Sequence, residues 1–192
     1  MNLRNLLPYL AAIMVALCWA GGVRADAIVN GGFETGDLTG WTTGGNGSVS
    51  VVTTNPYEGN YCALMQTGGS GEMMWSQLFN ASANEVISFA WRGVGDAGPG
   101  YTNAFANIYG PYIYGGVTLY DETDLPPSSA WQVYSYEVPT TGSYSVLFDT
   151  GGDSTVQFYF DDVQVTPEPA SVGLLAVGLS ALLLRRKTDW RK

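Results

Sequence analysis

The stretch WQVYSYEVPTTGSYSVLFD, residues 131–149, decides the fold class of this 192-residue chain. On each side of its Pro-Thr-Thr-Gly segment, every second residue belongs to a set that would lie on one side of an extended strand. The two recurring sets are Gln132, Tyr134 and Tyr136 in the first half, and Tyr144, Val146 and Phe148 in the second. A period of two predicts β-strands that each have one buried face and one face in water.

The same kind of short segment recurs along the chain between two distinctive tails. Short aromatic or β-branched runs alternate with clusters of Gly, Asn, Asp, Ser and Pro, and no long stretch has amphipathic helical spacing. Strands are predicted at Ser48–Thr53, Tyr61–Gln66, Met74–Phe79, Val86–Arg92, Ala104–Tyr109, Tyr114–Tyr120, Trp131–Val138, Ser143–Asp149 and Val156–Val165. We therefore predict an all-β domain over residues 26–166, a single jelly-roll β-sandwich of about eight or nine antiparallel strands.

The N-terminal tail has the order of a secretory signal peptide. Arg4 precedes an apolar run from Leu6 to Trp19, and small residues follow near Ala25. Basic, apolar and small segments in this order predict that residues 1–25 are removed on export. An N-terminal membrane anchor is the alternative, and it is disfavoured because the apolar run is short for a span of about 20 residues. A lipoprotein signal at Cys18 is disfavoured because bulky Leu17 precedes it.

The C-terminal tail mirrors the first. Residues 170–184 carry no charge, and Arg185, Arg186 and Lys187 follow at once. A buried core helix is the alternative, but Gly173, Gly178 and Ser180 leave this run without a polar face. We predict a transmembrane helix whose basic end, residues 185–192, stays in the cytoplasm.

The charges between the tails are almost all negative. Sixteen of the seventeen acidic residues and one of the eight basic residues, Arg92, lie between Asp26 and Glu168, which gives this part a net charge of −15. Phosphate binding needs basic side chains to displace counterions, so nucleic acid is excluded as a partner. Such a surface is expected to attract divalent cations.

Several catalytic classes are excluded by missing residue types. The chain has no histidine, which rules out Ser-His-Asp and Cys-His nucleophiles and histidine-bound zinc. Carboxylate pairs remain, as in glycoside hydrolysis, at Asp121, Glu122 and Asp124 or at Asp161 and Asp162. Neighbouring acids are expected by chance in so acidic a domain, so we predict no catalytic residues. Cys62 would be unpaired after export and is expected to be a small buried hydrophobe, with a reactive thiol as the alternative.

Two acidic motifs stand near the ends of the exported part. Asn30-Gly31-Gly32-Phe33-Glu34-Thr35-Gly36 precedes Trp41, and Phe158-Tyr159-Phe160-Asp161-Asp162-Val163 lies in the last predicted strand. Together with Gly59-Asn60-Tyr61, they resemble the galactose-binding-like jelly rolls found among carbohydrate-binding modules. The resemblance implies a structural calcium ion held by Glu34 and Asp161, with backbone carbonyls near Gly36 and Asn60. Calcium takes six to eight oxygen ligands and tolerates irregular geometry. The alternative is that these acids are merely exposed in turns.

Sugar binding needs aromatic rings exposed on a sheet or at loop tips. Candidates are Trp75, Trp91, Tyr101, Tyr109, Tyr112 and Tyr114, although aromatic residues in strands are more often core. The segment Tyr109–Gly116 is the best exception, since its Gly and Pro favour a loop or an edge. We predict ligand-binding roles for Tyr109, Tyr112, Tyr114 and Trp91.

The C-terminal motif Pro167-Glu168-Pro169, followed by the apolar run and by Arg185 and Arg186, resembles the PEP-CTERM sorting signal of Gram-negative bacteria that make exopolysaccharide. A chance Pro-Glu-Pro before an ordinary anchor is the alternative. The resemblance implies that an exosortase recognises and removes residues 167–192.

These features predict a non-enzymatic exported protein of the cell surface or extracellular matrix. It is anchored at first in the inner membrane, and its jelly roll engages exopolysaccharide. Two alternatives remain open: a purely structural matrix protein without a sugar site, and a secreted carbohydrate-active enzyme.

Overall fold

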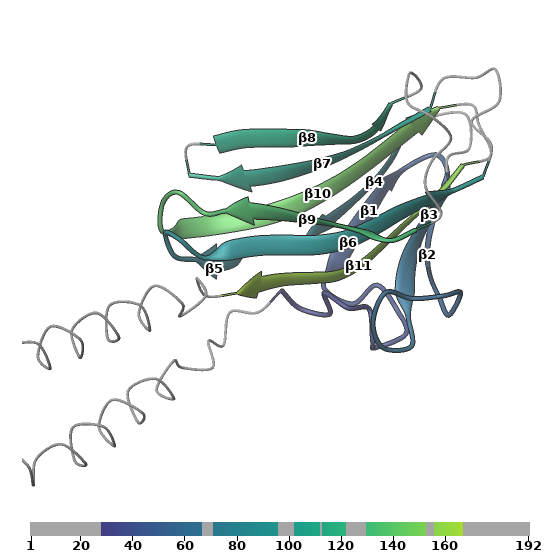
Figure 1. Cartoon of the computed structure of the whole chain (residues 1–192), viewed down its shortest axis with the longest axis horizontal. Helices are drawn as coiled ribbons and strands as arrows, with labels where there is room; N and C mark the ends of the chain where they lie inside the picture. Colours follow the sequence, from purple (N-terminus) through teal and green to yellow (C-terminus); the bar gives the residue numbers. More distant parts are fainter. Residues whose placement is uncertain are drawn as a thin grey trace, which may run out of the picture.

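In a computed structural model, the central part of the chain folds as two antiparallel β-sheets packed face to face (Figure 1). The structure describes residues 28–66, 71–95, 102–111, 113–121, 130–152 and 156–166. The predicted signal peptide and sorting tail lie outside these residues. Within them, no helix is long and apolar enough to cross a membrane.

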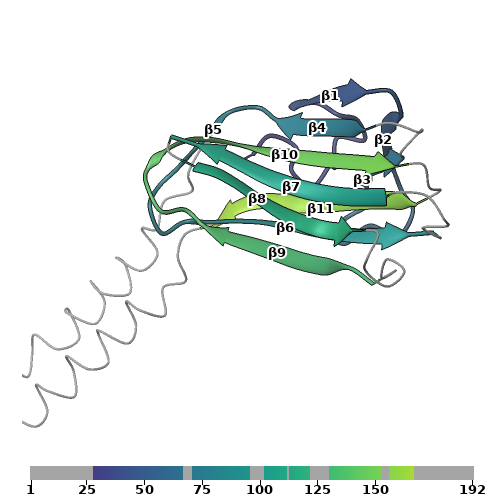
Figure 2. The ribbon, with the colours of Figure 1, turned by 90° about the horizontal axis from the view of Figure 1, so that it is seen from above.

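Each sheet has a central path of five strands. Sheet A has the order β1 (Trp41–Gly45), β4 (Glu72–Ser76), β10 (Gly142–Gly152), β7 (Thr102–Gly110) and β8 (Ile113–Asp121), and β5 (Phe79–Ala81) also pairs with β10. Sheet B has the order β2 (Ser48–Val52), β3 (Cys62–Gln66), β11 (Gln157–Thr166), β6 (Val86–Val94) and β9 (Gln132–Glu137). Figure 2 shows β4, β10 and β7 side by side in sheet A. The predicted β-sandwich is confirmed.

The core lies between the sheets and follows the alternation seen in the sequence. Tyr144, Val146 and Phe148 of β10 all point inward and are fully buried. The Phe148 ring lies 4.1 Å from the Phe160 ring and 4.9 Å from the Phe89 ring, measured between centroids. The inward residues of both sheets therefore interdigitate in one aromatic cluster, which the burial of apolar area stabilises.

All nine predicted strands are present, with boundaries shifted by a few residues. Two further strands, β1 and β5, were not predicted. Strand β1 reads Trp-Thr-Thr-Gly-Gly and carries one buried side chain, Trp41, so it has no apolar alternation. Strand β5 has only three residues and is held by its pairing with β10.

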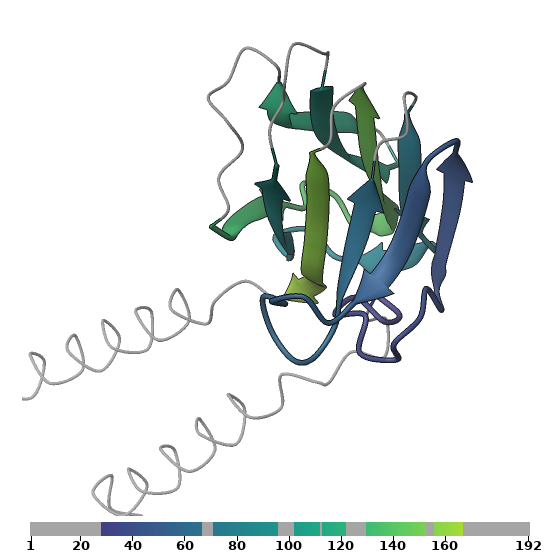
Figure 3. The same ribbon diagram turned by 90° about the vertical axis from the view of Figure 1, so that its right-hand side faces the viewer.

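The two ends of the domain are fastened together. The backbone N–H of Val163 in β11 donates a hydrogen bond of 3.0 Å to the carbonyl of Gly31. A Cβ at Gly31 would lie 1.9 Å from the Val163 carbonyl oxygen, so only glycine allows this approach. Figure 3 shows the first described residues, in purple, beside the end of β11.

Candidate functional site

The loop between β2 and β3 lies over the outer face of sheet B and is held there by two carboxylates. Asp161 Oδ2 accepts hydrogen bonds from the backbone N–H groups of Tyr57, at 2.8 Å, and Glu58, at 3.2 Å. Glu34 Oε1 accepts them from Asn60, at 2.8 Å, and Tyr61, at 2.9 Å. The N-terminal segment and the last strand therefore grip the same loop.

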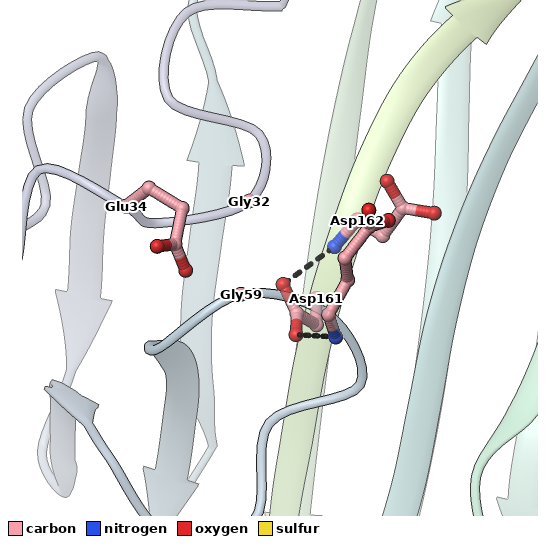
Figure 4. A pocket seen from close by; sticks show the side chains of 6 residues that line it. Gly32, Glu34, Gly59, Asp161 and Asp162 are labelled. Atoms are coloured by element: carbon pink, nitrogen blue, oxygen red, sulfur yellow. Dashed lines mark hydrogen bonds between the residues drawn. The ribbon is translucent and has the colours of Figure 1, made fainter.

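The two carboxylates border an open hollow of about 340 Å³, which Figure 4 shows from close by. Its lining consists of Gly32, Glu34, Glu58, Gly59, Asp161 and Asp162. Asp162 lies within a β-bulge and has a positive φ of 50°, which turns its side chain away from that of Asp161. Four acidic residues thus share one hollow. Since a water molecule occupies about 30 Å³ of liquid, the hollow has room for a cation with part of its water shell.

The electrostatics of these acids differ from one to another. Burial raises the pKa of Asp161 to about 6, against an ordinary value of 3.8, although three backbone N–H bonds oppose the shift. Burial and the charge of Glu58 raise the pKa of Asp162. The amides of Asn60 and Tyr61 lower the pKa of exposed Glu34. At Asp161 and Asp162, burial therefore disfavours the ionised form more than the hydrogen bonds favour it.

The calcium ligands implied by the family resemblance fit this hollow in part. Glu34 and Asp161 line it, whereas Gly36 and Asn60 do not. Gly36 instead lies against the Tyr61 ring. Within the described ranges, no three acidic or cysteine side chains form a ready-made metal cluster. The donor chemistry, oxygen atoms of carboxylates of which two, Asp161 and Asp162, have raised pKa values, nevertheless suits a hard cation that completes its shell with carbonyls and water.

The same loop buries the domain's single basic residue. Arg92 is 6% exposed, its guanidinium lies 4.1 Å from the centroid of the Tyr159 ring, and its Nη2 donates a 2.9 Å hydrogen bond to the Thr54 carbonyl. Cys62 lies fully buried beside it, and burial raises the pKa of its thiol to about 11. The expectation that Cys62 is a buried hydrophobe is confirmed. This part of the outer face of sheet B is closed to a ligand.

The outer face of sheet A has a different character. Residues that point away from the core occupy neighbouring positions across β4, β10 and β7. One row across these strands is Trp75, Leu147 and Asn107. The next row is Met73, Asp149 and Phe105. These side chains are half-buried or exposed, with Tyr109 on the same face of β7. A Cβ at Gly44 of β1 would lie 3.4 Å from the Trp75 ring, so this glycine leaves room for the ring to lie along the sheet. We call this surface, made of Met73, Trp75, Phe105, Asn107, Tyr109, Leu147 and Asp149, the aromatic face.

The structure separates the four residues predicted to bind sugar. Tyr109 is 37% exposed on the aromatic face. Tyr114 lies opposite Tyr109 in the register of β7 with edge strand β8, and Tyr112 lies outside the described residues. Trp91 was wrongly predicted: it is 6% exposed and packs in the core, because it shares the inward phase of Ile87 and Phe89 on β6.

The sequence marks Trp75 as a candidate but does not single out Phe105 and Asn107, which the structure places on the same face. No motif marks these residues. The one available signal was the phase of each strand, since Trp75 alternates with buried Met74 and Ser76. That phase places Trp75 outside the core, but only the register between β4, β10 and β7 brings it to the other members of the aromatic face.

This fold is similar to that of solved carbohydrate-binding modules. A solved module bound to β-1,4-galactotriose (TmCBM61) is 18% identical, with a TM-score of 0.55, and the match covers 73% of this chain and 97% of that one. The structure described as Family 16 Carbohydrate Binding Module-2 is 22% identical, with a TM-score of 0.51, and the match covers 72% of this chain and 98% of that one. At these identities the similarity shows the fold.

Two family models match parts of the sequence. Residues 25–83 match a carbohydrate binding domain, and residues 165–187 match the PEP-CTERM protein-sorting motif. Both resemblances drawn from the sequence are confirmed, and the sorting motif indicates export with a C-terminal membrane anchor before processing. No curated protein matches the chain.

Proposed function

We propose that this chain is an exported, non-enzymatic protein that binds carbohydrate on the aromatic face of sheet A. The observation that carries the proposal is the cluster of Trp75, Phe105 and Tyr109 on outward positions of neighbouring strands, beside polar Asn107 and Asp149. A folded core normally takes such rings inward, so their display on one face of a sheet needs another explanation.

The chemistry of this surface suits a sugar chain. Aromatic rings have an electron-rich face, which attracts the C–H groups on the flat side of a pyranose ring. The amide of Asn107 can donate and accept hydrogen bonds, and the carboxylate of Asp149 can accept them from hydroxyl groups. An apolar surface with a few fixed polar groups is typical of small-molecule sites.

The sorting motif supports a place for this activity. We propose that an exosortase recognises Pro167-Glu168-Pro169, together with Arg185 and Arg186, and releases the domain to the surface or matrix of a Gram-negative cell. Exopolysaccharide is the glycan that the domain would meet there. The PEP-CTERM match at residues 165–187 supports this reading.

Calcium is proposed as a structural cofactor of the domain. Glu34 and Asp161 would hold it, with Asp162 and Glu58 as further acidic groups at the same hollow. A bound cation would supply the positive charge that these acids lack, and would tie the N-terminal segment to the last strand.

The test is binding of the full-length chain, purified in neutral detergent, to a panel of insoluble and soluble polysaccharides. Substituting Trp75→Ala and Tyr109→Ala together should abolish retention, while Tyr57→Ala, an exposed ring on the loop over sheet B, should leave it unchanged. Retention that survives the double substitution would reject the aromatic face as the site. If the unaltered chain binds no polysaccharide, the purely structural matrix reading stands instead.

A further inference from the structure

The exposed surface of the domain offers no positive charge to a ligand. Between Asp26 and Glu168 the chain has sixteen acidic residues and one basic residue, Arg92. The structure buries Arg92 on sheet B, where its guanidinium stacks on Tyr159 and bonds to the Thr54 carbonyl. A polymer with carboxylate or sulfate groups would find repulsion and no counter-charge.

One acid stands within the aromatic face itself. Asp149 lies on β10, the central strand of sheet A, between Met73 of β4 and Phe105 of β7. It is the single charged side chain among the described outward-facing residues of this sheet. Its neighbours Phe148 and Thr150 point into the core and are fully buried, so Asp149 points to the outer side.

The carboxylate of Asp149 is half-buried. A Cβ built at Gly71 would lie 3.7 Å from Oδ1, and no described residue donates a hydrogen bond to this group. With no donor among the described residues, both oxygens can accept hydrogen bonds from a ligand. Apolar neighbours reduce solvent screening, which makes the charge felt more strongly at this place than on an open surface.

We propose that Asp149 makes the aromatic face selective for glycans without acidic groups, so that uncharged or amino sugars bind and uronic acid or sulfated polymers are rejected. The inference rests on the proposed function. Hydroxyl and ammonium groups bring protons that the Asp149 oxygens can accept. A sugar carboxylate or sulfate brings negative charge to a site that has no cation to pair with it.

The test compares acidic polysaccharides with uncharged forms of the same linkage. Alginate, polygalacturonate and hyaluronan are each paired with the carboxyl-reduced polymer, and the affinity of the full-length chain for every member is measured by calorimetry in neutral detergent. Any reduced form that binds should do so at least about tenfold more tightly than its acidic parent, a factor expected from one nearby charge at partial burial. High salt should bring this ratio of affinities closer to one, because it screens the repulsion between Asp149 and the acidic groups of the polymer.

Asp149→Asn carries the sharper prediction, because it keeps the shape of the side chain and removes its charge. The variant should reduce the ratio of neutral to acidic affinity about tenfold, with thermal stability not lowered, since no protein hydrogen bond is lost. Glu137→Gln is the matched control: it removes one charge from an exposed position on β9 of sheet B and should leave the ratio unchanged.

The outcomes separate this inference from the proposed function. Acidic polymers that bind as tightly as their reduced forms would overturn the selectivity, and an unchanged ratio in Asp149→Asn would overturn the role of that residue. Both results require glycan binding and so leave the proposed function in place. Absence of binding to every neutral polymer, here and in the wider panel, would reject the proposed function itself.

Discussion

Asp161 is the residue through which we expect the stability of the domain to depend on pH and on calcium. Its side chain is 1% exposed, and it accepts backbone hydrogen bonds from Tyr57, Glu58 and Asp162. Burial outweighs these bonds and raises the pKa of Asp161 to about 6, from an ordinary value of 3.8. Between these two values the folded chain binds more protons than the unfolded chain.

The stability of the cation-free domain should therefore fall as pH rises through this window. In EDTA, we expect the free energy of unfolding to be about 1 kcal/mol larger at about pH 5 than at about pH 7, and Asp161→Asn should flatten this dependence. Calcium favours the ionised carboxylate, so it should raise the melting temperature most at the higher pH. Thermal unfolding across pH, with and without Ca²⁺, measures both effects.

Two results would go against this account. A cation-free domain that is more stable at about pH 7 than at about pH 5 would mean that burial does not dominate at Asp161. A melting temperature that Ca²⁺ leaves unchanged at neutral pH would reject calcium as a structural cofactor.

The placement of a single residue could be predicted from the sequence where the residue belongs to a motif or to a strand with clear alternation. The acidic motifs marked Glu34 and Asp161, and the structure brings both to one hollow. The apolar setting of Cys62 correctly predicted its burial. Trp91, by contrast, is buried, and its apolar strand and its shared phase with Ile87 and Phe89 agree with a place in the core.

At the scale of elements, the loop between β2 and β3 behaves as an anchored cover over sheet B. Glu34 holds its Asn60 and Tyr61 amides, and Asp161 holds its Tyr57 and Glu58 amides. A charged acceptor forms stronger hydrogen bonds than a neutral one, so the half of the loop held by Glu34, whose pKa these amides lower, depends on an ionised carboxylate.

Replacing Glu34 by Gln should therefore release one half of the loop. Glutamine keeps one oxygen but loses the charge and brings donors toward the backbone N–H groups. We expect faster hydrogen exchange at Asn60 and Tyr61, with unchanged exchange in the core strand β10. Glu58→Gln is the control, because the loop is held by the backbone amide of Glu58 and not by its carboxylate. Equal protection of Asn60 in both variants would contradict the anchoring role of Glu34.

The strands themselves were predictable, and their neighbours in space were not. Alternation identified β9 and β10 at once, but these strands lie in different sheets. The aromatic face arises from pairing between β4, β10 and β7, which are separated by long stretches of sequence. No local periodicity encodes such pairing, because it depends on how the whole core is packed.

At the scale of the whole molecule, the chain combines a β-sandwich similar in fold to carbohydrate-binding modules with a C-terminal sorting motif. The sorting motif covers residues 165–187 and begins inside β11, so the domain leads directly into the tail. The charge pattern fits this arrangement, since basic residues are concentrated in the terminal segments and acids in the exported part.

Processing should depend on the central acid of the motif. Glu168→Ala is expected to leave the full-length chain in the inner-membrane fraction, whereas the proposed processing should shorten and release the native chain. Immunoblots of membrane and extracellular fractions measure this, with Asp189→Ala as a control that alters an acid beyond the basic cluster. Normal release of the Glu168 variant would mean that this motif is not what the exosortase reads.

The most direct test of the central claim is a map of amide chemical shifts on adding a polysaccharide that the chain retains. We predict the largest changes in β4, β7 and β10, around Trp75, Asn107 and Asp149 on the aromatic face. Changes confined to sheet B, or to the loop held by Glu34 and Asp161, would contradict the account.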